Sequence, residues 1–324
     1  MSNPDTAITA ITAITAIAAA GITYLYPGTR ALDGVSFEIT RGSVTALVGP
    51  NGGGKSTLLR CLAGLDRPLT GSIRVAGVDV LEDPRLAHAS MGYLSDFFGL
   101  YDTLTIRQSL THAASANGVA DAALSATVER TATRLDIADR LDQRCATLSR
   151  GLRQRVAIGQ AIVHAPAVLL LDEPASGLDP EARHALATLF TRLRDEGMTL
   201  VVSSHILAEL DEYSTHMLVL RAGKVVEHRL LGNSGTPANE RHVRVTLAAT
   251  HANWRETLDS LAGTRVIDTG ERSALLSIQG DAHEQARVLR ELIAAGAPVA
   301  SFAEETENLH QSYLRTVQPE ARPQ

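Results

Sequence analysis

The sequence predicts an α/β domain built on a partly parallel sheet, followed by a smaller α+β domain. From Gly21 onward, short apolar runs alternate with stretches of helical periodicity, which is typical of a mixed sheet covered by helices. The run 231–240, LGNSGTPANE, has no apolar periodicity and is rich in Gly, Asn, Ser and Pro, so it is predicted to link the two domains. A length of 324 residues agrees with two domains rather than one.

The first domain, residues 21–230, divides into a sheet core and a helical insertion. Five apolar or alternating runs are predicted as strands: 35–39, 44–48, 91–94, 168–171 and 199–203. Thr105 is a predicted helix cap, and helical periodicity follows it, so the insertion covers about 97–160. Asp179, Pro180 and Glu181 supply a cap, a first-turn proline and a first-turn acid, which predict a helix over 180–196.

The second domain, residues 241–324, is predicted to follow the order βαββαβ, which resembles the ferredoxin-like fold. The predicted elements are strand 243–247, helix 253–262, strands 265–268 and 274–278, helix 283–295 and strand 299–302. A last helix at about 305–316 is predicted to end the chain. This domain contains no group of residues that indicates catalysis, so we expect it to stabilise or to regulate a pair of copies of the chain.

Residues 1–20 are predicted to be a low-complexity leader, because the AIT triplet repeats with a period that fits neither a strand nor a helix well. The weakly polar stretch 7–20 is shorter than the roughly 17–25 residues of a membrane-spanning helix. Residues 1–6 contain Asp5 and no basic residue, which argues against a secretory signal.

The charge and the cysteine content of the chain exclude several classes of protein. A net charge of -6, with 20% charged residues of both signs, argues against a disordered chain and against nucleic acid as a main partner. Cys61 and Cys145 stand far apart with no Cys or His at metal-ligand spacing, so neither a disulfide framework nor a zinc site is predicted.

A glycine-rich loop between a predicted strand and a predicted helix indicates phosphate binding. It matches G-x-x-x-x-G-K-[ST] and consists of Gly49, Pro50, Asn51, Gly52, Gly53, Gly54, Lys55, Ser56 and Thr57. Glycines let backbone N–H groups approach phosphates, and the helix N-terminus adds positive potential. Lys55 is expected to reach the β- and γ-phosphates, and the Ser56 hydroxyl to bind Mg²⁺. The alternative is a glycine turn followed by an exposed lysine.

Two acids end the apolar strand at 168–171. Asp172 is expected to hold the metal through water, and Glu173 to polarise the water that attacks the phosphate. Taken alone, the segment is equally compatible with a strand end that caps a turn. The phosphate loop earlier in the same domain makes the catalytic interpretation the stronger one.

These motifs, together with residues 148–155, LSRGLRQR, resemble the ATP-binding subunits of ATP-binding-cassette (ABC) transporters over about 21–230. The octapeptide is similar to the family signature LSGGQ, with Arg150 and Leu152 at the third and fifth positions. The resemblance implies an ATPase cassette of the P-loop type. It also implies that Ser149 and Gly151 contact the γ-phosphate of ATP bound by a second copy of the chain, in an ATP-sandwich dimer.

Other residues match the family in order. Tyr26 resembles the aromatic residue that stacks on adenine, with packing beside Tyr24 as the alternative. Ser176 to Asp179, SGLD, resembles the loop that links the two nucleotide sites, which implies a nucleotide-site role for Asp179. His205 resembles the switch histidine that hydrogen-bonds the γ-phosphate.

The sequence departs from the family at Asp96, where a Gln or Glu is usual. A shorter carboxylate reaches less far, which affects the metal contact and the coupling expected there, and a nucleotide-binding regulator with poor hydrolysis is one alternative. The aromatic residues that follow, Phe97, Phe98 and Tyr101, fit either a socket for a helix of a membrane partner or an ordinary aromatic cluster.

The resemblance implies a peripheral subunit, on the cytoplasmic face of the membrane, that hydrolyses ATP to drive a separate integral-membrane permease. The closing segment 307–316, ENLHQSYLRT, resembles that of drug- and polyketide-resistance exporters, which favours export. The 117 residues from Lys55 to Asp172 leave no room for the coiled-coil arms of DNA-repair ATPases. The alternative is a soluble ATP-dependent switch that acts on a cytoplasmic partner.

Overall fold

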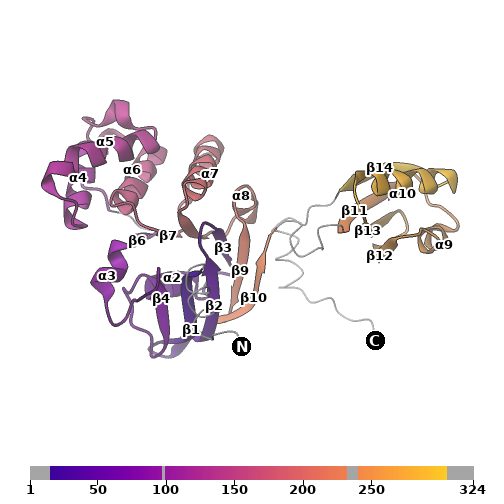
Figure 1. Cartoon of the computed structure of the whole chain (residues 1–324), viewed down its shortest axis with the longest axis horizontal. Helices are drawn as coiled ribbons and strands as arrows, with labels where there is room; N and C mark the ends of the chain where they lie inside the picture. The colour runs from indigo at the N-terminus through magenta and orange to yellow at the C-terminus, as the bar shows by residue number, and fades with distance from the viewer. Residues whose placement is uncertain (1–14, 97–98, 232–239, 305–324) are drawn as a thin grey trace, which may run out of the picture. The chain divides into compact units, whose positions relative to one another are not determined.

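The computed structural model describes residues 15–96, 99–231 and 240–304 (Figure 1). They form two compact units, of which the first ends at Arg229 and the second begins at Leu230. Within the described residues, no helix is both long enough and apolar enough to cross a membrane.

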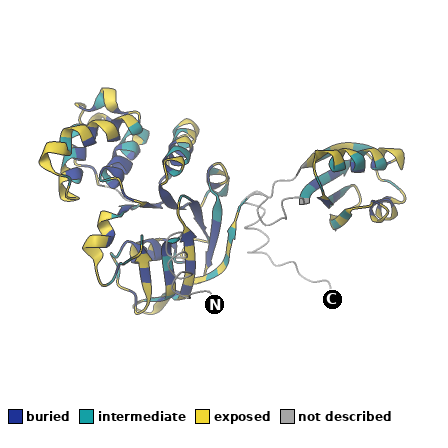
Figure 2. Ribbon diagram, in the orientation of Figure 1, coloured by how far each residue is buried: buried dark blue, intermediate teal, exposed yellow. Residues whose placement is uncertain are grey.

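A six-stranded sheet in the order β10-β9-β3-β8-β7-β6 forms the centre of the first unit. Its strands are β3 (Val44–Val48), β6 (Met91–Leu94), β7 (Val168–Asp172), β8 (Thr199–Ser203), β9 (His216–Arg221) and β10 (Lys224–Leu230). The strands from β9 to β6 run parallel to one another. Every residue of β3, β7 and β8 is buried, and Figure 2 shows β3 and β7 in dark blue. Such apolar runs are typical of parallel strands that are covered on both faces.

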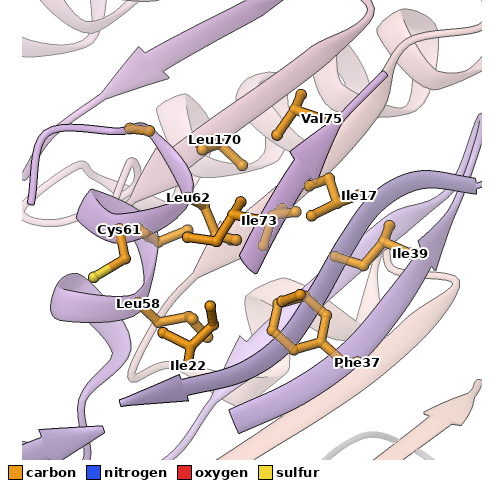
Figure 3. Packing of buried hydrophobic residues seen from close by; sticks show 14 of the residues in the cluster. Ile17, Ile22, Phe37, Ile39, Leu58, Cys61, Leu62, Ile73, Val75 and Leu170 are labelled. Atoms are coloured by element: carbon orange, nitrogen blue, oxygen red, sulfur yellow. The ribbon is translucent and has the colours of Figure 1, made fainter. Parts of the chain in front are cut away.

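An antiparallel sheet in the order β2-β1-β4-β5 packs against this centre. It contains β1 (Thr15–Tyr26), β2 (Thr29–Thr40), β4 (Thr70–Val75) and β5 (Val78–Asp79). Ile17, Phe37 and Ile39 from this sheet share one buried cluster with Leu58 of α2 (Lys55–Leu62) and Leu170 of β7, as Figure 3 shows. The helix that follows the glycine-rich loop is therefore held between the two sheets.

The first strand corrects the prediction of a leader over 1–20. Strand β1 begins at Thr15, and Ile17 is fully buried, so the last six predicted leader residues belong to the sheet. Ile17 pairs with Ile39 on one side and with Val75 on the other. Backbone pairing on both sides holds the strand in the sheet. Its register shifts between Ala19 and Ile22, so the sequence of β1 does not need the regular apolar–polar alternation of an ordinary strand. Residues 1–14 lie outside the described residues.

Three helices form the predicted insertion: α4 (Ile106–Ala116), α5 (Leu124–Arg134) and α6 (Arg150–Ile162). Thr105 caps α4 as the sequence predicts, and Gln108 completes a reciprocal capping box. A Cβ atom at Gly159 would lie 2.8 Å from the side chain of Leu110 and equally close to that of Leu135. Glycine at this position lets α6 pack closely against its neighbours.

Helices α3 (Pro84–Ala89), α7 (Pro180–Asp195) and α8 (Leu207–Asp211) complete the first unit. Asp179 caps α7 by accepting a hydrogen bond from the backbone N–H of Ala182 at 2.8 Å, and Pro180 is the first helical residue. The start of this helix therefore agrees with the sequence prediction.

The second unit has the predicted order βαββαβ. Its elements are β11 (Glu240–Leu247), α9 (Trp254–Asp259), β12 (Thr264–Thr269), β13 (Ser273–Gln279), α10 (Ala282–Ala294) and β14 (Val299–Glu304). The sheet is antiparallel in the order β12-β13-β11-β14, with the first and third strands of the unit in the middle. Val245, Trp254, Leu276 and Leu292 belong to one buried cluster of this unit. The last predicted helix, and Phe97 and Phe98, lie outside the described residues.

Candidate active site

The predicted catalytic and binding residues meet at one edge of the six-stranded sheet. Strands β3, β8, β7 and β6 are parallel neighbours, so their carboxyl ends lie at the same edge. The glycine-rich loop follows β3 from Gly49, Asp172 and Glu173 stand at the end of β7, and His205 follows β8. Asp96 lies two residues beyond β6. This is the edge where open α/β sheets bind ligands.

The glycine-rich loop is packed so closely that side chains do not fit at key positions. A Cβ atom at Gly49 would lie 2.0 Å from the carbonyl oxygen of Leu220. At Gly54, which has a φ of 104°, a Cβ would lie 2.6 Å from the carbonyl oxygen of Ala31. The loop therefore presents backbone at its surface, as phosphate binding requires.

Lys55 is the first residue of α2 and lies over the loop. Its ammonium group donates hydrogen bonds to the carbonyl oxygens of Gly49 at 2.9 Å and Pro50 at 3.3 Å. The side chain is buried, whereas Ser56 beside it is exposed. The positive charge and an exposed hydroxyl are thus both placed at a helix N-terminus.

Asp172 is buried, and its carboxylate is held in place by Ser203, a residue that belongs to none of the predicted motifs. Its Oδ1 accepts a hydrogen bond from the hydroxyl of Ser203 at 2.6 Å. The same hydroxyl oxygen accepts a hydrogen bond from the backbone N–H of Glu173 at 3.0 Å. Ser203 is the β8 residue paired with Asp172, and a hydroxyl at the end of a buried apolar run is the signal that identifies it.

Glu173 and His205 form a close side-chain pair. His205 Nδ1–H donates to Glu173 Oε2 at 2.6 Å, and the backbone N–H of His205 also donates to this oxygen, at 3.4 Å. The Glu173 side chain is mostly buried, whereas that of His205 is half exposed. Glu173 has a φ of 49°, a conformation that costs about 1–3 kcal/mol for a residue other than glycine. Such strain is typical of functional sites where surrounding contacts fix the backbone.

Three predicted residues lie on a separate groove of about 350 Å³ between α6 and α7. Ser149 caps α6 by accepting a hydrogen bond from the backbone N–H of Leu152 at 3.4 Å. Gly151 lies against Ala182, and Asp179 also lines the groove. The fold thus brings Ser149, Gly151 and Asp179 together on one surface, as their predicted contact with a second copy requires.

Tyr26 and Asp96 occupy exposed positions, and their predicted roles stay predictions. Tyr26 ends β1 and is 43% exposed, and its ring packs edge-on against Tyr24 with the centroids 4.9 Å apart. The tyrosine pair therefore fits both an adenine platform and simple packing. Asp96 is exposed beyond the end of β6.

Comparisons with known proteins define the family. The family model for ABC transporters matches residues 32–176. The daunorubicin/doxorubicin resistance ATP-binding protein DrrA of Streptomyces peucetius is 31% identical over 300 residues, which cover 91% of this chain and 90% of that protein. The chain belongs to the ATP-binding proteins of ABC transporters, and it is an ATPase subunit of that family.

Further relatives match mainly the first unit. A Nod factor export ATP-binding protein I of Rhizobium meliloti is 34% identical over 65% of this chain and 63% of that protein. The methionine import ATP-binding protein MetN of Bradyrhizobium diazoefficiens is 35% identical over 62% of this chain and 60% of that protein. The match therefore spans less than two thirds of these two relatives.

Solved structures agree with the fold. The ATP-binding subunit of an ABC transporter superposes with a TM-score of 0.61 at 30% identity, over 67% of this chain and 90% of the other. The cbiO1 protein of Clostridium perfringens, part of an ABC transporter complex, gives a TM-score of 0.60 at 27% identity, over 66% of this chain and 88% of the other. The predicted P-loop ABC-ATPase fold is confirmed.

Proposed function

We propose that this chain is the peripheral subunit of an exporter, which hydrolyses ATP on the cytoplasmic face of the membrane to drive a separate integral-membrane permease. The Glu173–His205 contact at the sheet edge that carries the glycine-rich loop is the observation on which the proposed hydrolysis depends. Two copies of the chain would enclose two ATP molecules between the glycine-rich loop of one and the Ser149–Gly151 segment of the other.

The direction of transport is inferred from the second unit. Relatives named for export and for import both match the first unit, so the cassette does not distinguish the two directions. The match to DrrA covers 91% of this chain and so extends through most of the second unit as well. A relative named for drug resistance therefore matches this chain in the second unit as well as in the first. We assign the second unit to stabilising or regulating the pair of copies.

The chemistry assigned to the site follows from its charges. Glu173 would orient and polarise the attacking water, a role for which a carboxylate at hydrogen-bond distance is suited. His205 holds this carboxylate through Nδ1–H, and Nε2 would donate to the γ-phosphate in the imidazolium form, in which both ring nitrogens carry a proton. Lys55 would exchange its two loop carbonyls for phosphate oxygens.

The residues present fit a magnesium ion. Mg²⁺ prefers oxygen ligands and is usually bound by one or two carboxylates together with substrate phosphates. The Ser56 hydroxyl and the Asp172 carboxylate supply such oxygens, and Ser203 holds Asp172 in place. The described part of the chain contains no cluster of three or more His, Cys, Asp or Glu residues that would hold a metal alone, which agrees with an ion held jointly with ATP. Bound there, Mg²⁺ would neutralise charge on the phosphates.

The test is co-purification from detergent-solubilised membranes of the native host, combined with ATPase assays on Glu173→Gln. We expect the substitution to lower kcat by about 10²–10⁴-fold, because the group that polarises the water is lost. A polytopic membrane protein in stoichiometric amount should accompany both the wild-type chain and the variant in the presence of ATP.

Glu212→Gln is the matched control, because Glu212 also contacts a histidine of the same unit, His184, at 3.3 Å. Its turnover should equal that of the wild type. Normal turnover in Glu173→Gln would contradict the catalytic assignment. A chain that dimerises with ATP but is recovered without any membrane partner would favour the soluble switch instead.

A further inference from the structure

Two loops of the cassette are joined at the catalytic pair. One runs from Glu173 at the end of β7 to Asp179, the cap of α7, and the other runs from Ser204 to Glu209 in α8. The side chains of Glu173 and His205 join the loops at their beginnings, with Nδ1 and Oε2 2.6 Å apart. The backbone N–H of His205 donates a second, longer hydrogen bond to the same oxygen, at 3.4 Å.

An ion pair joins the same loops further along. Arg183, in the first turns of α7, donates from Nη1 to Oε1 of Glu209 at 2.9 Å. Its Nε donates to the carbonyl oxygen of Leu178 at 3.1 Å. The Glu209 side chain is only 11% exposed, and this burial raises its pKa against the opposing effect of Arg183. Arginine thus binds a largely buried carboxylate and the backbone of the first loop at the same time.

Short contacts connect this ion pair back to the catalytic pair. On the histidine side, Glu209 Oε2 accepts a long hydrogen bond of 3.5 Å from the hydroxyl of Ser204, and the Ser204 hydroxyl oxygen accepts from the N–H of Ile206 at 3.0 Å. On the other side, the N–H of Ser176 donates to the carbonyl oxygen of Glu173 at 3.1 Å. Together with the backbone from Ser176 to Leu178 and from Ser204 to His205, these contacts form a closed ring that includes both members of the catalytic pair.

Arg150 connects the ring to residues 148–155, the signature segment. Its Nη2 donates to the carbonyl oxygen of Ser176 at 2.8 Å. The guanidinium lies against Gly177, where a Cβ atom would be 2.4 Å from Arg150 Cζ. Gly177 also has a φ of 67°, so a side chain there would be both strained and obstructed. Arg150 is one of the two residues at which the segment departs from LSGGQ, and this departure supplies the contact.

We propose that Arg183 and Glu209 are positioning residues that hold the Glu173–His205 pair in its hydrolytic geometry, and that Arg150 links this ring to the Ser149–Gly151 segment. The inference rests on the proposed function, because it takes Glu173 and His205 as the hydrolytic residues. The strained φ of Glu173 supports it, since a strained residue persists only where several contacts fix it. In a dimer, movement of the signature segment would displace Ser176 through its hydrogen bond with Arg150. Ser176 would in turn displace Glu173 of the same copy, because its N–H donates to the Glu173 carbonyl oxygen.

The experiment measures kcat and KM for ATP in the full chain with Glu209→Gln, Arg183→Gln and the double variant. Glutamine keeps the shape and polarity of the carboxyl side chain, so the fold is expected to survive. Each single variant should lower kcat about tenfold with KM for ATP within about twofold, because misplaced catalytic groups cost turnover more than binding. The double variant should lose no more than either single one, since both remove the same link.

Arg134→Gln and Glu196→Gln are the matched controls. They break another Arg–Glu contact that involves α7, at the opposite end of that helix and about 20 Å from Arg183 by helical rise. Both controls should leave kcat unchanged. The proposal would be overturned if the kcat losses of Arg183→Gln and Glu209→Gln multiplied in the double variant. It would also be overturned if either single variant kept the wild-type kcat.

Arg150→Gly restores the family glycine and tests the link to the signature segment. It should lower kcat severalfold in the wild-type background and cause no further loss in the Glu209→Gln background. Arg150→Lys, which keeps a donor for the Ser176 carbonyl, should recover part of the rate. Equal losses in both backgrounds would place Arg150 outside the ring. If Glu173→Gln retained full turnover, the proposed function itself would fail, and the two failures are thereby distinguished.

Discussion

The central sheet of the first unit is mainly parallel, whereas the sheet of the second unit is antiparallel, and this difference explains where the functional residues lie. In the first unit, neighbouring strands β3, β8, β7 and β6 run in the same direction, so four successive carboxyl ends meet at one edge. In the second unit every neighbouring pair is antiparallel, so adjacent strands end at opposite edges. A parallel sheet gathers loop residues from distant parts of the sequence, whereas an antiparallel sheet distributes them.

The cores of the units show the same contrast. In the cassette, the buried polar groups include two of the site, Asp172 and Ser203, which lie at the ends of strands whose other residues are mainly apolar. In the second unit, the inner faces of the sheet and of its two helices pack into an apolar cluster that includes Val245, Trp254 and Leu276. We expect ATP binding to depend on the cassette alone.

The largest expected effect on ATP binding comes from the glycine-rich loop. Gly54→Ala places a Cβ 2.6 Å from the carbonyl oxygen of Ala31 at a φ of 104°, so the loop must shift and its backbone N–H groups no longer converge on phosphate. We expect ATP affinity to be lost and the free energy of unfolding to fall by about 2–3 kcal/mol. Nucleotide titration and chemical denaturation measure the two quantities.

Gly52→Ala is the matched control for this substitution. Gly52 also has a positive φ, of 74°, but a Cβ atom at this position would have no neighbouring atom within 4 Å. The Gly52→Ala variant should therefore show backbone strain of about 1 kcal/mol without a steric displacement of the glycine-rich loop. Equal losses of ATP affinity in the two variants would mean that strain, and not close packing, controls the loop.

A much smaller effect is expected at Asp96. Its side chain is exposed beyond β6, so Asp96→Gln, which restores the residue usual in the family, should change basal kcat by less than about threefold. Steady-state ATPase assays on the isolated chain test this expectation. Asp96→Asn is the control for charge alone. A tenfold increase in kcat in the glutamine variant only would show that side-chain length at this position limits hydrolysis.

The smallest effect on ATP binding is expected from a core substitution in the second unit. Leu276 is fully buried and pairs with Val243 and Val266 on the two neighbouring strands, so Leu276→Ala should destabilise that unit by about 2–5 kcal/mol. The affinity for ATP should stay at the wild-type value. Calorimetry and nucleotide titration follow the two properties together. A parallel loss of affinity would contradict the independence of the cassette.

Residues with a local signature were predicted from the sequence. The capping residues Thr105 and Asp179, the glycine-rich loop and the acids after β7 lie where the sequence places them, because caps, tight turns and buried strand ends depend on a few neighbouring residues. Strand β1 was not predicted, and its first six residues were wrongly assigned to a leader. Ala16 and Ile17 are buried through pairing with β2 and β4, whose residues are distant in sequence, and the AIT repeat carries no sign of those partners.

The sequence by itself determined the motifs of this protein, its two-unit order and its ABC ATPase chemistry, since each rests on residue types at fixed spacing. Only the tertiary structure decided which side chains support that chemistry. Ser203 reaches Asp172, and Glu209 reaches Arg183, through parallel strand pairing and helix packing across 26 to 31 residues of sequence. Contacts of this kind have no local periodicity, because their geometry is set by how strands and helices pack, and not by the residues next to them in the chain.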